Sequence, residues 1–215
     1  MEEDALIAAA QAYIREVFQN DYSGHDYFHS LRVFKTAERI AQQEAADRTV
    51  VQLAALLHDV DDRKLSPQTH AHKDRATAFL RAQGVCVRRI EAICTIIGEV
   101  SYSGTDSVVP ETIEGKCVQD ADRLDAIGAI GIARAFAYGG SHGRAIHDPE
   151  IKPRLQMSGE QYQRHISSSV NHFYEKLFNL AERMNTRSAR QIAEHREQFM
   201  REYLREFLDE WEGLL

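Results

Sequence analysis

The chain has 215 residues, of which 43% are hydrophobic and 27% charged, so it carries enough apolar side chain to bury a core. Its 26 Lys and Arg against 33 Asp and Glu give a net charge of −7. This balance argues against binding to duplex nucleic acid or to an anionic membrane, because both need clustered cations. A small anionic substrate stays compatible with it, because a local basic pocket or a bound metal ion can override the overall sign.

The three cysteines, Cys86, Cys94 and Cys117, form no CxxC pair, which disfavours a structural zinc site and a disulfide framework. The acidic start, residues 1–4, is unlike the basic start of a signal peptide. The unbroken apolar runs, such as residues 53–57, are far shorter than the about 18 residues that a membrane span needs. We therefore expect a cytoplasmic protein with no membrane partner.

Apolar residues recur at helical spacing along the chain, and the four prolines fall between the periodic segments. The predicted fold class is therefore all-α. The first two helices are expected over 4–18 and 27–43, the second with its apolar face at Phe28, Leu31, Phe34, Ile40 and Ala41. A third, over 49–58 and capped by Asp47, has almost no polar face, which is typical of a buried central helix.

Further helices are expected over 72–83, ending before Gly84, and over 87–97, although 93–100 could also form a strand. A long segment, 111–138, is predicted to stop at Gly139 and Gly140. Residues 139–158 then form a loop that could serve as a lid. Two amphipathic helices follow, whose stripes predict core packing or a dimer face: Ile166, Val170, Phe173, Leu177 and Leu180 in one, and Ile192, Phe199, Tyr203, Phe207 and Trp211 in the other.

Chemistry-bearing residues gather around the end of the predicted buried helix. His58 and Asp59 stand there, and a buried charge beside a histidine needs a partner or a metal ion. Upstream lie His25, Asp26 and His29; downstream lie Asp120, Asp122 and Asp125. Histidine nitrogen with carboxylate oxygen suits Mn²⁺, Fe²⁺, Ni²⁺ and Zn²⁺, and Mg²⁺ less well. Favourable charge at a helix N-terminus explains the downstream aspartates poorly, because Pro110 predicts an earlier helix start.

The order His29, His58-Asp59, Asp122 resembles the H…HD…D signature of the HD superfamily of metal-dependent phosphohydrolases. The surrounding residues are similar to the short, single-domain YedJ-like bacterial branch. The matching stretches are residues 25–33, 53–60 and 118–131. The resemblance implies one domain over 1–215, with an HD core at about 20–140 and C-terminal helices at about 159–215 packed on it.

The resemblance also implies roles for individual residues. It implies metal ligands at His29, His58, Asp59 and Asp122, the last chosen over Asp120 and Asp125 by its Ala-Asp-x-Leu context. Asp62 occupies the position three residues after the metal-binding Asp, where many relatives have Glu, and is expected to accept or relay a proton. Asp125 is expected to orient Arg123, a ligand histidine or a water. No extra histidine pair stands at the spacing of a two-metal site, which argues against the two-iron HD oxygenases, although His70 and His72 leave this open.

Positively charged side chains are expected to bind the substrate phosphate. Arg32 and Lys64 are the first candidates, and Arg63 and Arg144 rank below them. The implied activity is hydrolysis of a nucleotide or other small phosphate ester or anhydride by metal-activated water, with nucleoside triphosphate pyrophosphohydrolase or nucleotidase nearest. The cofactor is a divalent ion (Mn, Ni, Co, Fe, Zn or Mg, with Mn favoured), and the chain is expected to be a monomer or homodimer. The alternative is a non-catalytic HD domain that binds metal or nucleotide as a sensor.

Overall fold

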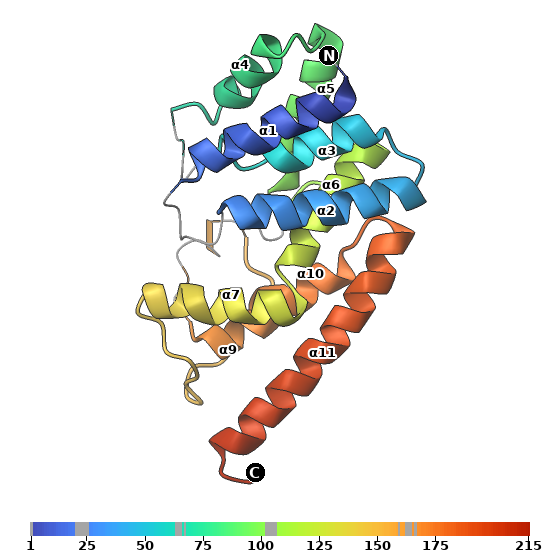
Figure 1. Ribbon diagram of the computed structural model, residues 1–215. Coiled ribbons are helices and arrows are strands. Elements are labelled where there is room, and N and C mark those ends of the chain that lie inside the picture. Colours follow the sequence, from blue (N-terminus) through green and yellow to red (C-terminus); the bar gives the residue numbers. More distant parts are fainter. Residues whose placement is uncertain are drawn as a thin grey trace. The chain divides into compact units, whose positions relative to one another are not determined.

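The structure, a computed structural model, describes residues 2–19, 26–62, 66, 68–101, 107–158, 160–161, 165 and 167–215 (Figure 1). The elements of these residues are helices, which confirms the predicted all-α class. None of the helices in this described part is long and apolar enough to cross a membrane. The chain forms two compact units: unit 1 is Met1–Ser101 with Val108–Asp122, and unit 2 is Tyr102–Ser107 with Arg123–Leu215.

Unit 1 is built around helix α3 (Arg48–Leu57), as the sequence predicts. The Asp47 carboxylate accepts a hydrogen bond from the Val50 N–H at 3.1 Å and starts the helix. Every residue from Thr49 to Leu57 except Gln52 is buried. Helices α1 (Glu3–Val17), α2 (Tyr27–Gln43) and α5 (Val87–Val100) pack against α3 (Figure 1). The end of α3 therefore lies inside unit 1.

Two more helices complete unit 1. Helix α4 (Asp74–Ala82) packs on α5, and its Phe79 ring stacks on Tyr13 of α1 with centroids 4.7 Å apart. Helix α6 (Ile113–Asp125) belongs to unit 1 as far as Asp122. The strand considered for residues 93–100 is wrong, because α5 runs through them with its isoleucines at 90, 93, 96 and 97 buried along one side.

Two details of unit 1 differ from the sequence predictions. Phe28 is 65% exposed, because the buried side of α2 follows a different stripe: His29, Ser30, Val33, Phe34, Ala37, Ile40 and Ala41. Helix α4 starts at Asp74 rather than at residue 72, since Lys73 has a left-handed backbone (φ 53°) that a helix cannot include. The Asp61 carboxylate accepts hydrogen bonds from the N–H groups of Arg75 and Ala76, at 3.2 and 2.9 Å, and so caps this helix.

Unit 2 contains α7 (Gly128–Ser141), α9 (Ser169–His172), the π-helical segment η1 (Phe173–Leu177), α10 (Phe178–Glu182) and α11 (Arg187–Trp211). Helix α11 packs on α7 and α10, and α7 packs on α9. The Phe136 ring of α7 lies 6.1 Å from both Phe173 and Tyr203, so aromatic rings fill the space between these helices.

The long segment predicted over 111–138 is in fact two helices, and the predicted stop at Gly139 and Gly140 is wrong. Gly128 has φ +75°, a left-handed conformation that separates α6 from α7. Helix α7 then continues through both later glycines to Ser141. The helix ends at Ser141, and Gly143 follows with φ +65°, where the Arg144 N–H donates to the Gly139 carbonyl at 2.9 Å.

The apolar stripes predicted for the last two helices are only partly buried. Val170, Phe173, Leu177 and Leu180 are buried, whereas Ile166 lies outside the described residues. On α11, Phe199 and Trp211 are 44% and 47% exposed. The side of α11 that is buried carries Ala189, Ala193, Met200 and Leu204, one position round the helix from the aromatic stripe.

Glycines of α7 offer a matched test of close packing. A Cβ at Gly131 would collide with the Ala126 carbonyl group, whereas a Cβ at Gly140 would meet nothing within 4 Å. We expect Gly131→Ala to cost more than about 1 kcal/mol of unfolding free energy, and Gly140→Ala to stabilise by about 0.4–1 kcal/mol. Chemical denaturation of the two variants checks this, and equal effects would contradict it.

Candidate metal centre

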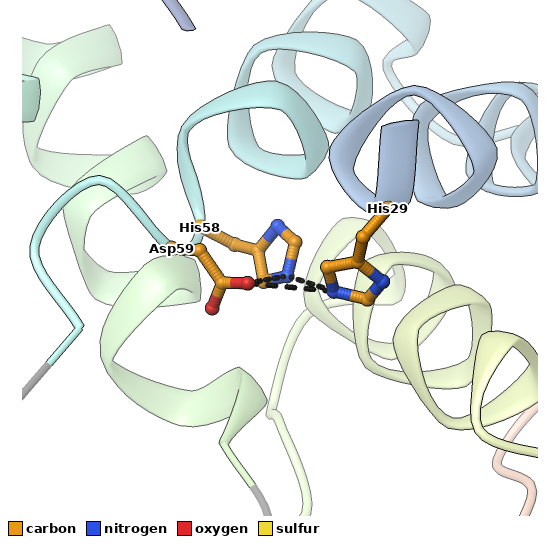
Figure 2. A group of neighbouring side chains, drawn as sticks. All are labelled: His29, His58 and Asp59. Carbon is orange, nitrogen blue, oxygen red and sulfur yellow. Dashed lines mark hydrogen bonds and ion pairs between the residues drawn. The ribbon is translucent and has the colours of Figure 1, made fainter. Parts of the chain in front are cut away.

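Three side chains of unit 1 converge at the end of α3 (Figure 2). His58 is the C-cap of α3, Asp59 follows it, and His29 comes from the first turn of α2. The Asp26 carboxylate holds that first turn by accepting a hydrogen bond from the His29 N–H at 2.7 Å. The side chains of His29, His58 and Asp59 are 0%, 3% and 8% exposed. The helix that is buried on all sides thus delivers two of the three groups to the interior.

The facing atoms of this cluster are close. The Nε2 atoms of His29 and His58 lie 3.3 Å apart, and the Asp59 Oδ2 lies 3.4 Å from the first and 3.3 Å from the second. In the part of the chain that the structure describes, these three residues are the one group of His, Cys, Asp or Glu with potential ligand atoms this close.

Asp122 of α6 joins the two histidines. Its Oδ1 lies 3.4 Å from the His29 Nε2 and 3.8 Å from the His58 Nε2. The side chain is 25% exposed, more than any of the other three. Asp122 lies near the end of α6, so the charge of a helix N-terminus does not explain it.

These distances fit a common metal ion. Ligand atoms about 2.1 Å from one ion, at angles between octahedral and tetrahedral, lie about 3.0–3.4 Å apart. The separations of 3.3–3.8 Å that the two histidine Nε2 atoms make with each other and with the two aspartates need only a small contraction. Two imidazoles and two carboxylates are also a donor set that divalent transition ions accept.

A hydrogen bond to the backbone, made by the ring nitrogen that does not face the cluster, orients the His58 ring. Its Nδ1 lies 2.8 Å from the Ala55 carbonyl oxygen, to which it donates a hydrogen bond. This contact leaves Nε2 as the atom that faces the cluster, and in the neutral ring Nε2 has a lone pair. A second hydrogen bond of this kind is typical of metal-binding histidines.

The charges of the cluster shift the proton affinities of its members. Burial lowers the pKa of His58, but the negative charges of Asp59 and Asp122 outweigh burial and raise this pKa above its usual value. Burial raises the pKa of Asp122, but the hydrogen bond and positive charge of His29 and the charge of His58 outweigh it, so this pKa lies below its usual value. The cluster is therefore suited to hold positive charge among its carboxylates, whether protons or a metal ion.

The two aspartates after Asp59 have different environments. Asp61 is 1% exposed, and its carboxylate caps α4. Asp62 is half-buried, and its N–H donates to the Asp59 carbonyl at 3.0 Å, so it belongs to the turn that directly follows the cluster. The capping role of Asp61 is absent from the sequence predictions, because a carboxylate that caps a helix far along the chain leaves no local pattern.

Of the other predicted site residues in this unit, some lie in the described part of the chain and some do not. Arg32 lies one turn after His29 on α2 and is half-buried, whereas Lys64 and Arg63, like His25, lie outside the described residues. His70 Nδ1 donates to the Asp61 carbonyl at 2.8 Å, and His72 is exposed.

Two more predicted residues belong to unit 2. Arg144 follows α7, with its guanidinium 5.3 Å above the Tyr138 ring. Asp125 accepts a hydrogen bond from Arg134 at 2.6 Å, a partner that the sequence did not indicate.

The site combines two histidines and two aspartates in an all-helical unit, and the second aspartate comes from a later helix. This arrangement is that of a helical protein with an H…HD…D metal site. A family model for the HD domain matches residues 26–127. The chain belongs to the HD superfamily, as the resemblance predicted. The narrower similarity to the YedJ-like branch stays a prediction.

Relatives extend this similarity over nearly the whole chain. YpgQ of Bacillus subtilis is 34% identical over 206 residues, which cover 95% of this chain and 93% of YpgQ. The crystal structure of YpgQ in complex with ADP matches with a TM-score of 0.78 at 34% identity, covering 98% of this chain and 96% of the other. An HD-superfamily hydrolase from Bacillus thuringiensis matches with a TM-score of 0.79 at 38% identity, covering 98% of both chains.

Metal affinity is expected to depend on pH. A metal ion must displace the proton that the raised pKa of His58 favours, so affinity should fall as the pH drops below that pKa. The loss should approach about tenfold per pH unit for each proton displaced. Titration of the chelator-treated protein with Mn²⁺ between pH 8 and pH 5.5 measures it. An affinity that does not change over this range would contradict the prediction.

Proposed function

We propose that this chain is a metal-dependent phosphohydrolase whose metal ligands are His29, His58, Asp59 and Asp122. The observation that carries the proposal is that the two histidine Nε2 atoms lie 3.3–3.8 Å from each other and from one carboxylate oxygen of Asp59 and of Asp122, in a largely buried place. The likeness to HD-superfamily hydrolases supports hydrolysis as the reaction.

The character of the cluster favours chemistry over a purely structural metal site. Structural zinc sites are closed and rich in cysteine, whereas these four residues include no cysteine. The cluster is also uneven in exposure, because Asp122 is 25% exposed while His29 is fully buried. The side at Asp122 is therefore where solvent and a substrate can approach.

A bound divalent ion would lower the pKa of a water and polarise a phosphoryl oxygen. Among the protein groups, Asp62 takes the proton of that water or relays it to solvent. The backbone hydrogen bond from the Asp62 N–H to the Asp59 carbonyl keeps Asp62 in the turn that directly follows the ligands. The Ala55 carbonyl fixes the His58 ring, and Arg32 contributes positive charge one turn from His29.

The substrate we propose is a nucleotide or another small phosphate ester or anhydride. The support is that YpgQ, a relative over nearly the full length, was crystallised with ADP. Nucleoside triphosphate pyrophosphohydrolase and nucleotidase are the activities to test first, with Mn²⁺ as the favoured ion, because imidazole ligands suit transition metals. A cytoplasmic location and a monomeric or homodimeric state are part of the same proposal.

Hydrolysis of a panel of deoxynucleoside triphosphates, nucleoside monophosphates and a generic phosphodiester tests this function. We expect turnover with Mn²⁺ and its loss in excess chelator. Asp62→Asn should keep the metal but lower kcat by about 10²–10⁴-fold. The control is Asp61→Ala, which should lower stability by about 0.5–2 kcal/mol through the lost helix cap. A metal-loaded wild type without turnover on any compound would overturn the proposal in favour of a sensor.

The choice of the fourth ligand has a matched test in the same helix. Asp122→Asn should abolish metal binding or turnover, because it removes a proposed ligand. Asp125→Asn should keep the metal with at most a 10–100-fold effect, because its carboxylate contacts Arg134 instead. Metal content, thermal stability and turnover of both variants decide between them. The assignment of Asp122 fails if its variant keeps the metal and the Asp125 variant loses it.

A further inference from the structure

Phe28 is an exposed ring that stands directly before the buried His29, and the proposed metal centre does not use it. Its side chain is 65% exposed, more than that of any other Phe, Tyr or Trp among the described residues. His29, the next residue of α2, is 0% exposed. Because an apolar ring stabilises a fold through its burial, Phe28 contributes little to the stability of unit 1. Its place at the surface, one residue from a proposed ligand, therefore points to a role in binding.

Contacts with Tyr27 and Arg15 hold this ring in place. The rings of Tyr27 and Phe28 meet in a T-shaped arrangement, with centroids 5.3 Å apart and planes at 67°. Tyr27 is in turn bound to α1, the helix that packs beside α2 (Figure 1). Its hydroxyl accepts a hydrogen bond from Arg15 Nη2 at 3.0 Å, and the Arg15 guanidinium carbon lies 4.8 Å from its ring centroid. The exposed ring is thus oriented before a ligand arrives.

The backbone of this first turn is also fixed. The Asp26 carboxylate accepts the N–H of His29 at 2.7 Å, and the Asp26 carbonyl accepts the N–H of Ser30 at 3.2 Å. Phe28 lies inside the turn that these two hydrogen bonds close. The position of its ring relative to the metal centre is therefore set by the same turn that positions His29.

Helix geometry also places Phe28 beside Arg32. Arg32 lies four residues after Phe28 and three after His29, and residues at these spacings are neighbours on the surface of a helix. Four residues advance by about 6 Å along the helix axis. A phosphate bound at the metal centre and Arg32 would then have the Phe28 ring about one sugar unit away. This order of phosphate, sugar and flat ring is that of a nucleotide.

We propose that Phe28 binds the base of the nucleotide substrate by stacking on it. Stacking needs a flat, exposed ring and accepts any base, because every base has a π-face. A metal ion and Arg32 recognise phosphate alone, so they do not distinguish a nucleotide from an inorganic polyphosphate. Phe28 supplies that distinction. The choice of a nucleotide as the ligand rests on the proposed function.

Titration calorimetry of the full, Mn²⁺-loaded chain with ADP and with pyrophosphate tests this proposal. Phe28→Leu keeps an apolar side chain but removes the ring, so ADP binding should weaken about 5- to 100-fold while pyrophosphate binding stays unchanged. Phe28→Trp should bind ADP at least as tightly as the wild type. The matched control is Phe199→Leu, which removes a ring of 44% exposure from unit 2 and should change neither affinity.

Fluorescence separates stacking from a structural effect of the substitution. The chain has one tryptophan, Trp211, so Phe28→Trp combined with Trp211→Phe leaves a single indole, at the position of the proposed contact. Its emission should be quenched by ADP and not by pyrophosphate, because only ADP carries a base. Equal responses to the two compounds would contradict stacking.

Wild-type affinity for ADP in Phe28→Leu would overturn the proposal, as would an equal loss of ADP and pyrophosphate binding, or a wild type that does not bind ADP. Thermal unfolding and Mn²⁺ content are measured for each variant, and Phe28→Met replaces Phe28→Leu if the latter does not fold. The two proposals fail separately. A wild type that binds ADP through Phe28 without turnover ends the hydrolase proposal and leaves stacking standing; turnover with unaltered ADP binding in Phe28→Leu does the reverse.

Discussion

The cost of burying charge governs unit 1. Helix α3 is buried on nearly all sides, and the chain places a histidine and an aspartate directly at its end. A carboxylate at 8% exposure is costly unless positive charge compensates it. His29 and Asp122 reach this place from α2 and α6, and together with the upward pKa shift of His58 they show a site built to hold positive charge. A single divalent ion would supply this positive charge to both carboxylates at once.

The contacts behind the cluster matter as much as its facing atoms. Asp26 fixes the start of α2 and Ala55 fixes the His58 ring, while Asp61 fixes the turn that follows Asp59 by capping α4. Metal ligands bind an ion more tightly when they are held in place before it arrives, because ordering them on binding costs free energy. Two side-chain carboxylates and one backbone carbonyl supply that order, and none of Asp26, Ala55 and Asp61 is itself a proposed ligand.

Local arrangement matters more than total charge for what this chain can bind. The cluster in unit 1 presents carboxylates and imidazoles, which suit a metal ion. A metal ion held there would offer positive charge to an anion in a chain whose net charge is −7.

The sequence by itself determined the all-α class, the buried helix over 49–58 with its Asp47 cap, and the residues of the H…HD…D order. These rest on local signals: helical periodicity, a capping side chain and motif spacing. It misplaced the break between α6 and α7, the end of α7 and the buried side of α2, because a left-handed Gly128, the Ser169 contact at Gly139 and the exposure of Phe28 depend on which elements meet. The capping role of Asp61 was decided only by tertiary structure, since it joins residues that are apart along the chain and become adjacent only once the helices pack.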